Sequence, residues 1–258
     1  MAENDDAALL RFYDDFADDY HFVYGGEWEA AVRRQGQALD ALIRDLLPDA
    51  STVLDCSCGI GTQALGLARL GYRLVGSDIS AGEIHRAQRE ADRIGVEASF
   101  RVADFRDLKG VEGHFDVVIS CDNAIPHLLT ESDVSKALAQ MRAKTRLGGL
   151  LVITMRDFDR ALNERPPIAP PVIVPGSPRR VLVRLHDWDD DQPFYTVRYL
   201  VLSEADDAWT VKEHAMRYRA ITRAELTAAS EAAGFHEIAW PADRTVVGGQ
   251  QVMTARAS

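Results

Sequence analysis

Short apolar runs alternate with amphipathic stretches along the first part of the chain. Five apolar runs predict strands, and they lie at residues 52–54, 73–75, 99–102, 115–120 and 150–154. Between them, apolar residues at helical spacing predict helices at residues 62–70, 81–94 and 131–145. Short strands that alternate with helical crossovers form a parallel sheet that is covered on both faces. The pattern therefore predicts an α/β fold.

Two helical stretches precede these strands. Phe12, Phe16 and Tyr20 recur at helical spacing in an acidic segment. Residues 27–47 carry a second amphipathic pattern, which Pro48 ends because proline cannot continue a helix. We therefore expect a helical segment ahead of the sheet.

The pattern changes after Asp159. Residues 163–178 hold six of the ten prolines and predict a loop. Three alternating stretches then predict antiparallel strands, near residues 179–188, 194–203 and 208–220. A capping-box pattern of Thr222 and Glu225 starts a further helix, and two final strands are expected near residues 235–240 and 251–256.

The whole pattern predicts a Rossmann-like, seven-stranded, mostly parallel sheet with an antiparallel last strand and an antiparallel β insertion after the fifth strand. It divides the chain into an N-terminal helical lid (residues 1–48), a core (residues 49–160 and 221–258) and the insertion (residues 161–220). The insertion could cap a substrate site, form the contact of a homodimer, or both.

Charge and composition narrow the class of partner. The 258 residues include 29 Lys and Arg against 40 Asp and Glu, which gives a net charge of −11. Binding to nucleic-acid phosphates favours an excess of basic residues, so we expect a small-molecule partner and no nucleic acid. Three cysteines without a CxxC pair, and an acidic N-terminus without a secretory signal, indicate the cytoplasm. No apolar run is long enough to span a membrane, and the scattered histidines predict no metal site.

The sharpest motif is DCSCGIGT at residues 55–62, between a predicted strand and a predicted helix. Glycines in such a loop let the backbone approach a ligand closely and adopt positive φ. Asp78 ends the next strand, where a carboxylate can accept both hydroxyls of a ribose. Together these features predict an adenosine-containing ligand. The spacing Gly59-x-Gly61-x-x-Ala64 also matches the dinucleotide fingerprint, so a nicotinamide cofactor is an alternative.

Three features favour S-adenosylmethionine over a nicotinamide cofactor. Asp55 precedes the glycines, where a carboxylate can meet an ammonium but would repel a pyrophosphate. Asp104 follows the third strand, where it can accept a hydrogen bond from the adenine amino group. The chain also closes on a helix and two strands, which fits a sheet with an antiparallel last strand.

These residues resemble the class I S-adenosylmethionine-dependent methyltransferases over nearly the whole chain. The resemblance implies that Asp78 takes the ribose, that Ile79 packs on the adenine, and that Asp104 and Phe105 flank it. It implies further cofactor-binding positions at Tyr13, Arg34 (or the adjacent Arg33), Asp55, Ser57, Gly59, Gly61, Thr62 and Cys121. Arg33 or Arg34 would hold the cofactor carboxylate. Ser57 departs from the family, in which many members have glycine, and a small residue is expected to be tolerated there.

Asn123, His127 and Arg156 follow the fourth and fifth strands, so they should meet at the acceptor end of the site. With the N-terminal aromatic stretch, which includes Tyr20, they resemble the glycine and sarcosine N-methyltransferases. The resemblance implies that Arg156 clamps a substrate carboxylate, that Asn123 accepts from the substrate amine, and that His127 lies near the acceptor or the cofactor carboxylate. Each also has a plain structural explanation: an ion pair of Arg156 with a nearby aspartate, a turn at Asn123, and a helix cap or core position for His127. The tyrosines could likewise serve packing alone.

The sequence therefore predicts methyl transfer from S-adenosylmethionine to a small molecule, most simply to the amine of a glycine-like amino acid. Transfer to oxygen or another atom of a secondary metabolite would show the same cofactor half. A nicotinamide-dependent oxidoreductase and a non-catalytic subunit with the methyltransferase fold are alternatives of other classes. A nucleic-acid methyltransferase is disfavoured, because the Asn/Asp-Pro-Pro-aromatic loop after the fourth strand is missing.

Overall fold

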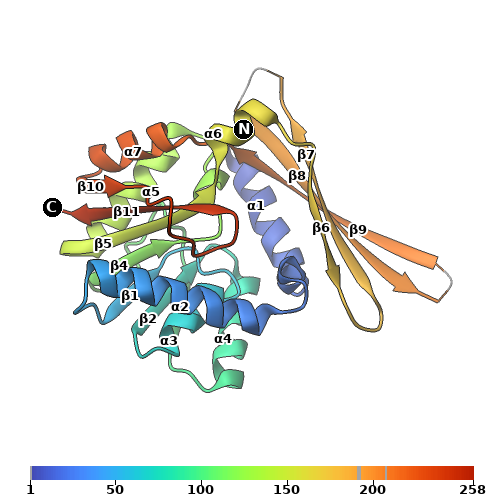
Figure 1. The fold of residues 1–258 in the computed structure, drawn as a ribbon, viewed down its shortest axis with the longest axis horizontal. Helices are drawn as coiled ribbons and strands as arrows, with labels where there is room; N and C mark the ends of the chain where they lie inside the picture. Colours follow the sequence, from blue (N-terminus) through green and yellow to red (C-terminus); the bar gives the residue numbers. More distant parts are fainter. Residues whose placement is uncertain (1, 191–192, 207) are drawn as a thin grey trace.

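The computed structural model describes residues 2–190, 193–206 and 208–258, with side chains from Ala7 onward. Its central sheet has the strand order β10-β11-β5-β4-β1-β2-β3 (Figure 1). The strands are β1 (Thr52–Asp55), β2 (Arg73–Asp78), β3 (Ser99–Val102), β4 (Phe115–Ser120), β5 (Thr145–Arg156), β10 (Phe235–Ala239) and β11 (Gln250–Ala257). Strand β11 runs antiparallel to both β5 and β10, whereas β1 to β5 pair in parallel. The predicted seven-stranded, mostly parallel sheet is confirmed.

Helices cover both faces of this sheet. One face carries α2 (Trp28–Leu46), α3 (Thr62–Ala68) and α4 (Ala81–Ile94), and the other carries α5 (Glu131–Lys144) and α7 (Arg223–Ala232). Successive side chains of a strand point to opposite faces, so Val117 and Ile119 of β4 join one apolar cluster and Val118 joins the other. This two-sided burial explains why the strands appear in the sequence as continuous apolar runs.

Polar side chains fix the points at which the helices begin. Ser80 accepts a hydrogen bond from the backbone N–H of Glu83 at the start of α4. Thr222 and Glu225 form the predicted capping box at the start of α7. Such caps satisfy backbone donors that the first helical turn leaves without partners, and they hold each helix in register with the preceding strand.

The insertion forms a four-stranded antiparallel sheet in the order β6-β7-β8-β9. Its strands are β6 (Ile168–Val174), β7 (Arg180–Trp188), β8 (Phe194–Ala205) and β9 (Ala208–Arg219). The prediction of a loop over residues 163–178 is wrong for β6, which contains Pro170 and Pro171. Proline is tolerated there because β6 is an edge strand and its pairing with β7 shifts register between Ala169 and Val172. A short helix, α6 (Phe158–Glu164), precedes the sheet and was not predicted.

The N-terminal helix α1 (Ala2–Phe16) lies between the core and the insertion (Figure 1). Phe12 and Phe16 pack against Tyr199 of β8. On the core side, Asp14 accepts hydrogen bonds from the Ser80 hydroxyl and the Gly82 backbone N–H at the start of α4. A 3-10 helix, η1 (Tyr20–Tyr24), then leads into α2. Helix α1 is therefore held by both the core and the insertion.

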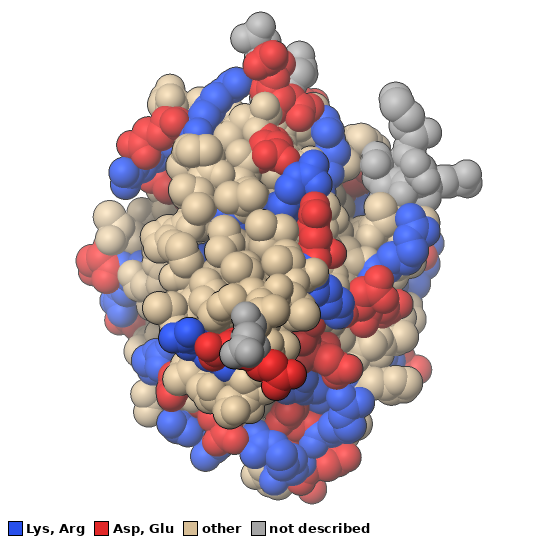
Figure 2. All heavy atoms as spheres, turned by 90° about the vertical axis from the view of Figure 1, so that its right-hand side faces the viewer, with Lys and Arg blue, Asp and Glu red and all other residues tan. Residues whose placement is uncertain are grey.

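The outer side of the molecule, on which β6 to β9 lie, carries acidic and basic side chains that are interspersed (Figure 2). Within the described residues, no helix is long and apolar enough to cross a membrane. Residue 1 of the predicted lid and residues 191, 192 and 207 of the predicted insertion lie outside the described part of the chain.

Candidate active site

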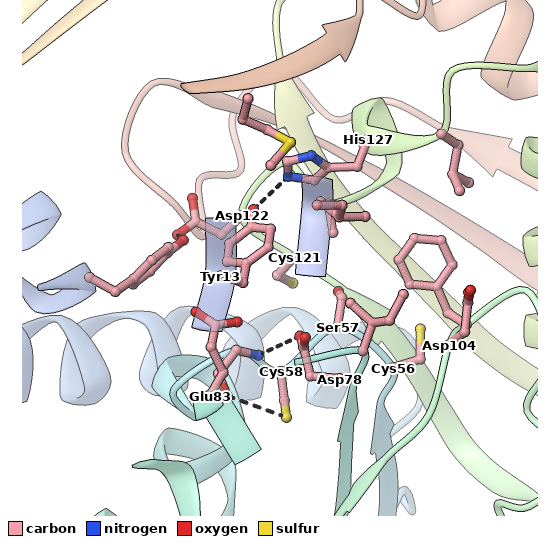
Figure 3. Close-up of a pocket in the computed structure, with 18 of the residues that line it drawn as sticks. Tyr13, Cys56, Ser57, Cys58, Asp78, Glu83, Asp104, Cys121, Asp122 and His127 are labelled. Atoms are coloured by element: carbon pink, nitrogen blue, oxygen red, sulfur yellow. Dashed lines mark hydrogen bonds between the residues drawn. The ribbon is translucent and has the colours of Figure 1, made fainter. Parts of the chain in front are cut away.

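A cavity of about 580 Å³ lies where β1, β2 and β4 reach their carboxyl ends (Figure 3). Open parallel sheets bind ligands at this edge, and the volume suits a small-molecule ligand. Most of the predicted site residues line it, namely Tyr13, Tyr20, Ser57, Gly59, Thr62, Asp78, Ile79, Asp104, Phe105, Cys121 and His127. The remaining predicted residues lie outside the lining, namely Arg34, Asp55, Gly61, Asn123 and Arg156.

The loop after β1 forms one wall of the cavity. Gly59 and Gly61 both have positive φ, at 51° and 90°, which glycine adopts without steric cost. The Gly59 backbone N–H donates to Asp78 Oδ2 at 2.9 Å, so the loop and the end of β2 are joined directly. Ser57, which stands where many family members have glycine, bonds through its hydroxyl to Ser120 at 2.9 Å. The serine is accommodated by this neighbour.

Asp55 lies fully buried beneath the loop. Burial raises the pKa of its carboxyl to about 8, the backbone N–H of Ser57 lowers it in part, and the charge of Asp78 raises it. Oxygen Oδ2 of Asp55 has no hydrogen-bond partner among the described residues. A buried carboxyl with an unused acceptor is suited to a cationic partner, such as an ammonium group.

Glu83 of α4 is a site residue that the sequence analysis missed. It lines the cavity, it is only 2% exposed, and its Oε1 has no partner among the described residues. Burial raises the pKa of this carboxyl well above its usual value, and the nearby Asp78 adds to the shift. Its position three residues after the cap Ser80 is typical of a capping box, so the sequence signal pointed to a structural role.

The opposite end of the cavity is formed by the segment after β3. Phe105 and Asp104 line the cavity there, and Figure 3 shows Asp104 far from Glu83 and Asp122. The Asp104 carboxylate accepts from Arg106 Nε at 2.8 Å and from the Arg106 backbone N–H at 2.7 Å. These bonds fix the orientation of the carboxylate at the rim.

Tyr13 of α1 reaches across the cavity to His127. Its hydroxyl lies 2.6 Å from Nε2 of His127, and both side chains line the cavity (Figure 3). Burial lowers the pKa of His127 to about 3, with a further contribution from the positive charge of Arg156. The imidazole is therefore neutral at physiological pH. A base with so low a pKa is poorly suited to deprotonating a hydroxyl acceptor.

Arg156 ends β5 and lies behind the cavity wall rather than in it. One guanidinium nitrogen donates to the Tyr195 hydroxyl at 3.4 Å, and the group lies over the Tyr218 ring. The Tyr218 ring lies between Arg156 and His127, because its centroid is 4.3 Å from that of the His127 ring, and His127 lines the cavity. The aspartates that could have paired with Arg156 have other partners: Asp157 caps α6, and Asp159 pairs with Arg223.

The structure corrects the expected contact of Asn123. Its side-chain oxygen accepts from the Arg156 backbone N–H at 3.1 Å, and the residue is 4% exposed and outside the cavity lining. Asn123 has positive φ, at 70°, so it also forms the turn after β4. It therefore joins the ends of β4 and β5 and does not present its oxygen to the cavity.

The expectation for Arg34 is also corrected. Arg33 and Arg34 are both exposed on α2, and neither lines the cavity. The buried side of α2 instead presents Trp28, whose Nε1 donates to the Thr62 hydroxyl at 2.8 Å. The helical pattern placed both arginines on α2 but did not show which way they face.

Asp122 is a second site residue that the sequence analysis missed. It lines the cavity and has positive φ, at 57°, which is uncommon for a residue other than glycine. Its Oδ2 accepts from the hydroxyls of Tyr24 and Tyr20, at 2.9 and 3.4 Å. Its Oδ1 accepts from Nε2 of Gln250 at 2.8 Å. Three donors from η1 and β11 thus hold this carboxylate at the cavity edge.

These residues fit S-adenosylmethionine. The unpartnered Asp55 carboxyl suits its ammonium, and the buried carboxyls of Asp78 and Glu83 suit hydroxyl groups. A side chain at Gly59 would stand 3.4 Å from Glu83 Oε2 and would fill the space over the loop. Among the residues that the structure describes, no group of three His, Cys, Asp or Glu side chains is placed to hold a metal ion.

Comparison with known proteins shows a match to one family model and a shared fold. Residues 53–149 match the family model described as a methyltransferase domain. The fold resembles that of S-adenosylmethionine-bound CalS10, an amino pentose methyltransferase from Micromonospora echinaspora, with a TM-score of 0.77 and 20% identity over 88% of this chain and 92% of that one. The sugar N-methyltransferase KedS8 from a Streptoalloteichus species gives a TM-score of 0.73 and 19% identity, over 88% of this chain and 87% of that one. The chain therefore carries a methyltransferase domain with the fold of the S-adenosylmethionine-dependent methyltransferases, and S-adenosylmethionine is the cofactor of that class.

More specifically, the chain is similar to glycine/sarcosine N-methyltransferases. The protein of that name from Parasynechococcus marenigrum is 31% identical over 154 residues, which is 59% of this chain and 53% of the relative. That from Halorhodospira halochloris is 26% identical over 155 residues, which is 59% of this chain and 56% of the relative. The chain thus spans about half the length of these curated relatives.

Proposed function

We propose that the protein transfers a methyl group from S-adenosylmethionine to the amine nitrogen of a small molecule that also carries a carboxylate. The observation that carries this proposal is the half-buried Arg156 guanidinium, which contacts Tyr195 and Tyr218 and forms no ion pair with an acidic side chain of the described residues. A buried cation without an anionic partner is costly, so it suits an anionic ligand group. Arginine presents a planar fork that matches a carboxylate.

The cofactor, when bound, supplies a methyl group on a positively charged sulfur that is an excellent leaving group. Asp78, Glu83 and Gly59 line the cavity and would hold it there, with Asp55 beneath the loop. The remaining task of the chain is to align an uncharged amine with that methyl group and to exclude water. Tyr13 from α1 and Met216 from β9 line the cavity and would exclude water from it. This fits a lid role for the N-terminal helical segment and a cap role for the β insertion.

An amine acceptor needs no dedicated base if it binds uncharged, whereas a hydroxyl acceptor does. The neutral His127, with its pKa lowered to about 3, argues against activation of a hydroxyl. Relatives named for glycine and sarcosine support an amino-acid acceptor, although they match only part of their length. Neighbours named as an amino pentose methyltransferase and a sugar N-methyltransferase make an amino sugar the second candidate, which would have no use for Arg156 as a carboxylate partner.

The test is a methylation assay with S-adenosylmethionine labelled in its methyl group and read by mass spectrometry. Glycine, sarcosine, dimethylamine and an amino sugar are the acceptors. We expect label in glycine or sarcosine and a KM for them that rises about tenfold to a hundredfold in Arg156→Lys, because the bidentate contact is lost. Arg160→Lys, at an exposed position, is the matched control. Label in the amino sugar alone, with Arg156→Lys equal to the wild type, would refute the carboxylate-bearing acceptor.

A further inference from the structure

Two side chains of opposite charge extend from the ends of neighbouring strands at the acceptor end of the site and do not form an ion pair with each other. Asp122 follows β4 and Arg156 ends β5, and these are neighbouring strands. The hydrogen-bond and ring partners of each side chain are neutral groups. Asp122 accepts from Tyr24 and Gln250, while Arg156 contacts Tyr195 and the Tyr218 ring. Among the described residues, no ion pair involves either of the two.

The backbone fixes the two charges relative to each other. The Asp122 backbone N–H donates to the Thr154 hydroxyl at 2.8 Å, and the Arg156 backbone N–H donates to the Asn123 side chain at 3.1 Å. The Thr154 hydroxyl in turn donates to Gln250, which holds the Asp122 carboxylate. The backbone positions from which the two side chains extend are thus fixed at the strand ends.

This arrangement also costs free energy. Asp122 and Asn123 both have positive φ, a conformation that strains residues other than glycine. Half-burying a carboxylate and a guanidinium without an ion pair between them adds a further cost. Such costs are typical of sites whose charges are compensated by a ligand.

We propose that Asp122, which lines the cavity, binds the acceptor nitrogen, and that the acceptor carboxylate is directed toward Arg156 behind the adjoining wall, as in an amino acid or N-methylated amino acid. This inference rests on the proposed function and adds its nitrogen-binding residue. The expected partner from the sequence was the neighbouring Asn123, whose oxygen is already occupied by the Arg156 backbone.

The contact would matter most as the methyl group is transferred. The acceptor first loses one ammonium proton to water and binds as an amine, with an N–H donated to Asp122. A nitrogen–carbon bond then forms from the amine lone pair, the carbon–sulfur bond breaks, and sulfur keeps that electron pair. Nitrogen becomes positively charged beside the Asp122 carboxylate, so the hydrogen bond strengthens toward the transition state. Asp122 should therefore influence kcat as well as acceptor binding.

Calorimetry on the intact protein saturated with S-adenosylhomocysteine tests this without any turnover. The probes are sarcosine, dimethylamine, which lacks the carboxylate, and acetate, which lacks the nitrogen. The variant Asp122→Asn keeps the size of the side chain and removes its charge, and Asp187→Asn, at an exposed position of β7, is the control. We expect Asp122→Asn to weaken sarcosine and dimethylamine at least about tenfold and to leave acetate and S-adenosylhomocysteine within about twofold.

The outcomes separate the two proposals. Unchanged sarcosine binding in Asp122→Asn would overturn the role of Asp122, as would equal weakening of S-adenosylhomocysteine, which would assign Asp122 to the cofactor. A wild-type protein that binds S-adenosylhomocysteine but neither amine would also overturn it. A wild-type protein that fails to bind S-adenosylhomocysteine would instead refute the proposed methyltransferase function. Loss of dimethylamine binding in Asp122→Asn, with acetate not bound by the wild type, would support Asp122 and refute the carboxylate contact of Arg156.

Discussion

Tyr13 and His127 lie 114 positions apart in the chain and share a hydrogen bond of 2.6 Å between the phenol oxygen and the Nε2 atom of the imidazole. The bond joins helix α1 to the short segment that follows β4, at the acceptor end of the cavity. The other ring nitrogen of His127, Nδ1, is buried and has no partner among the described residues. Among the described residues, Tyr13 supplies the side-chain hydrogen bond of this imidazole, and the bond links α1 to the other wall of the cavity.

Replacing Tyr13 with phenylalanine should loosen α1. The loss leaves both nitrogens of a buried imidazole without a hydrogen bond, which costs about 1–3 kcal/mol. We expect faster tryptic cleavage at Arg11 and a higher KM for the acceptor, measured on the folded protein. Tyr72→Phe is the control, because it also loses a side-chain hydrogen bond, the one to Asp40 of α2, away from α1. Equal cleavage rates in the two variants would contradict a closing role for Tyr13.

The ionisation of Asp55 should make stability depend on pH. Its pKa is raised to about 8 in the folded protein, mainly by burial, and it returns to about 4 in the unfolded chain. Between these values the folded state holds a proton that the unfolded state has released, so this contribution to stability falls as the pH rises through that window. Urea unfolding between pH 5 and pH 8 should show a flatter pH dependence for Asp55→Asn than for the wild type.

The exposed Asp49→Asn serves as the control for that titration. Its pH dependence should follow the wild type. Parallel curves for the wild type and Asp55→Asn would show that Asp55 ionises normally in the folded protein, and the account of its environment would then be wrong.

Helices α2 and α3 meet at a pair of glycines. A Cβ built on Gly36 would lie 2.6 Å from the Gly66 backbone, closer than atoms can pack. Gly36→Ala should therefore push the helices apart and destabilise the protein by about 1–3 kcal/mol, despite the better helix propensity of alanine. Gly110→Ala, with no atom within 4 Å of the added carbon, is the control for urea unfolding. A Gly36→Ala variant as stable as the control would show that α2 and α3 can separate without cost.

The fold was largely predictable because its strands are buried on both faces. Continuous apolar runs such as that of β4 leave few alternatives, and the glycine loop fixes the order of strand, loop and helix. Strand β6 escaped prediction because its prolines are typical of loops, and they are tolerated only at the edge that β6 occupies. The position of an edge depends on the pairing of the other strands, which a local pattern does not show.

The cofactor half of the site was more predictable than the acceptor half. Asp78 and Gly59 follow from the loop pattern, because local chain geometry places them. The acceptor half depends on the direction of single side chains, and there adjacent residues differ: Asp122 faces the cavity, whereas Asn123 turns back to Arg156. Glu83 was not predicted as a site residue for a similar reason. Its spacing from Ser80 is typical of a helix cap, so the sequence pattern indicates a structural role. A cytoplasmic location and a homodimer stay predictions.

The central claim is that the cavity binds S-adenosylmethionine and not a nicotinamide dinucleotide. Calorimetric titration of the purified protein with S-adenosylmethionine and, separately, with NADH tests it most directly. We predict micromolar binding of S-adenosylmethionine, a marked loss of it in Asp78→Ala, and no binding of NADH. Binding of NADH with no binding of S-adenosylmethionine would contradict the assignment and would point to redox chemistry instead.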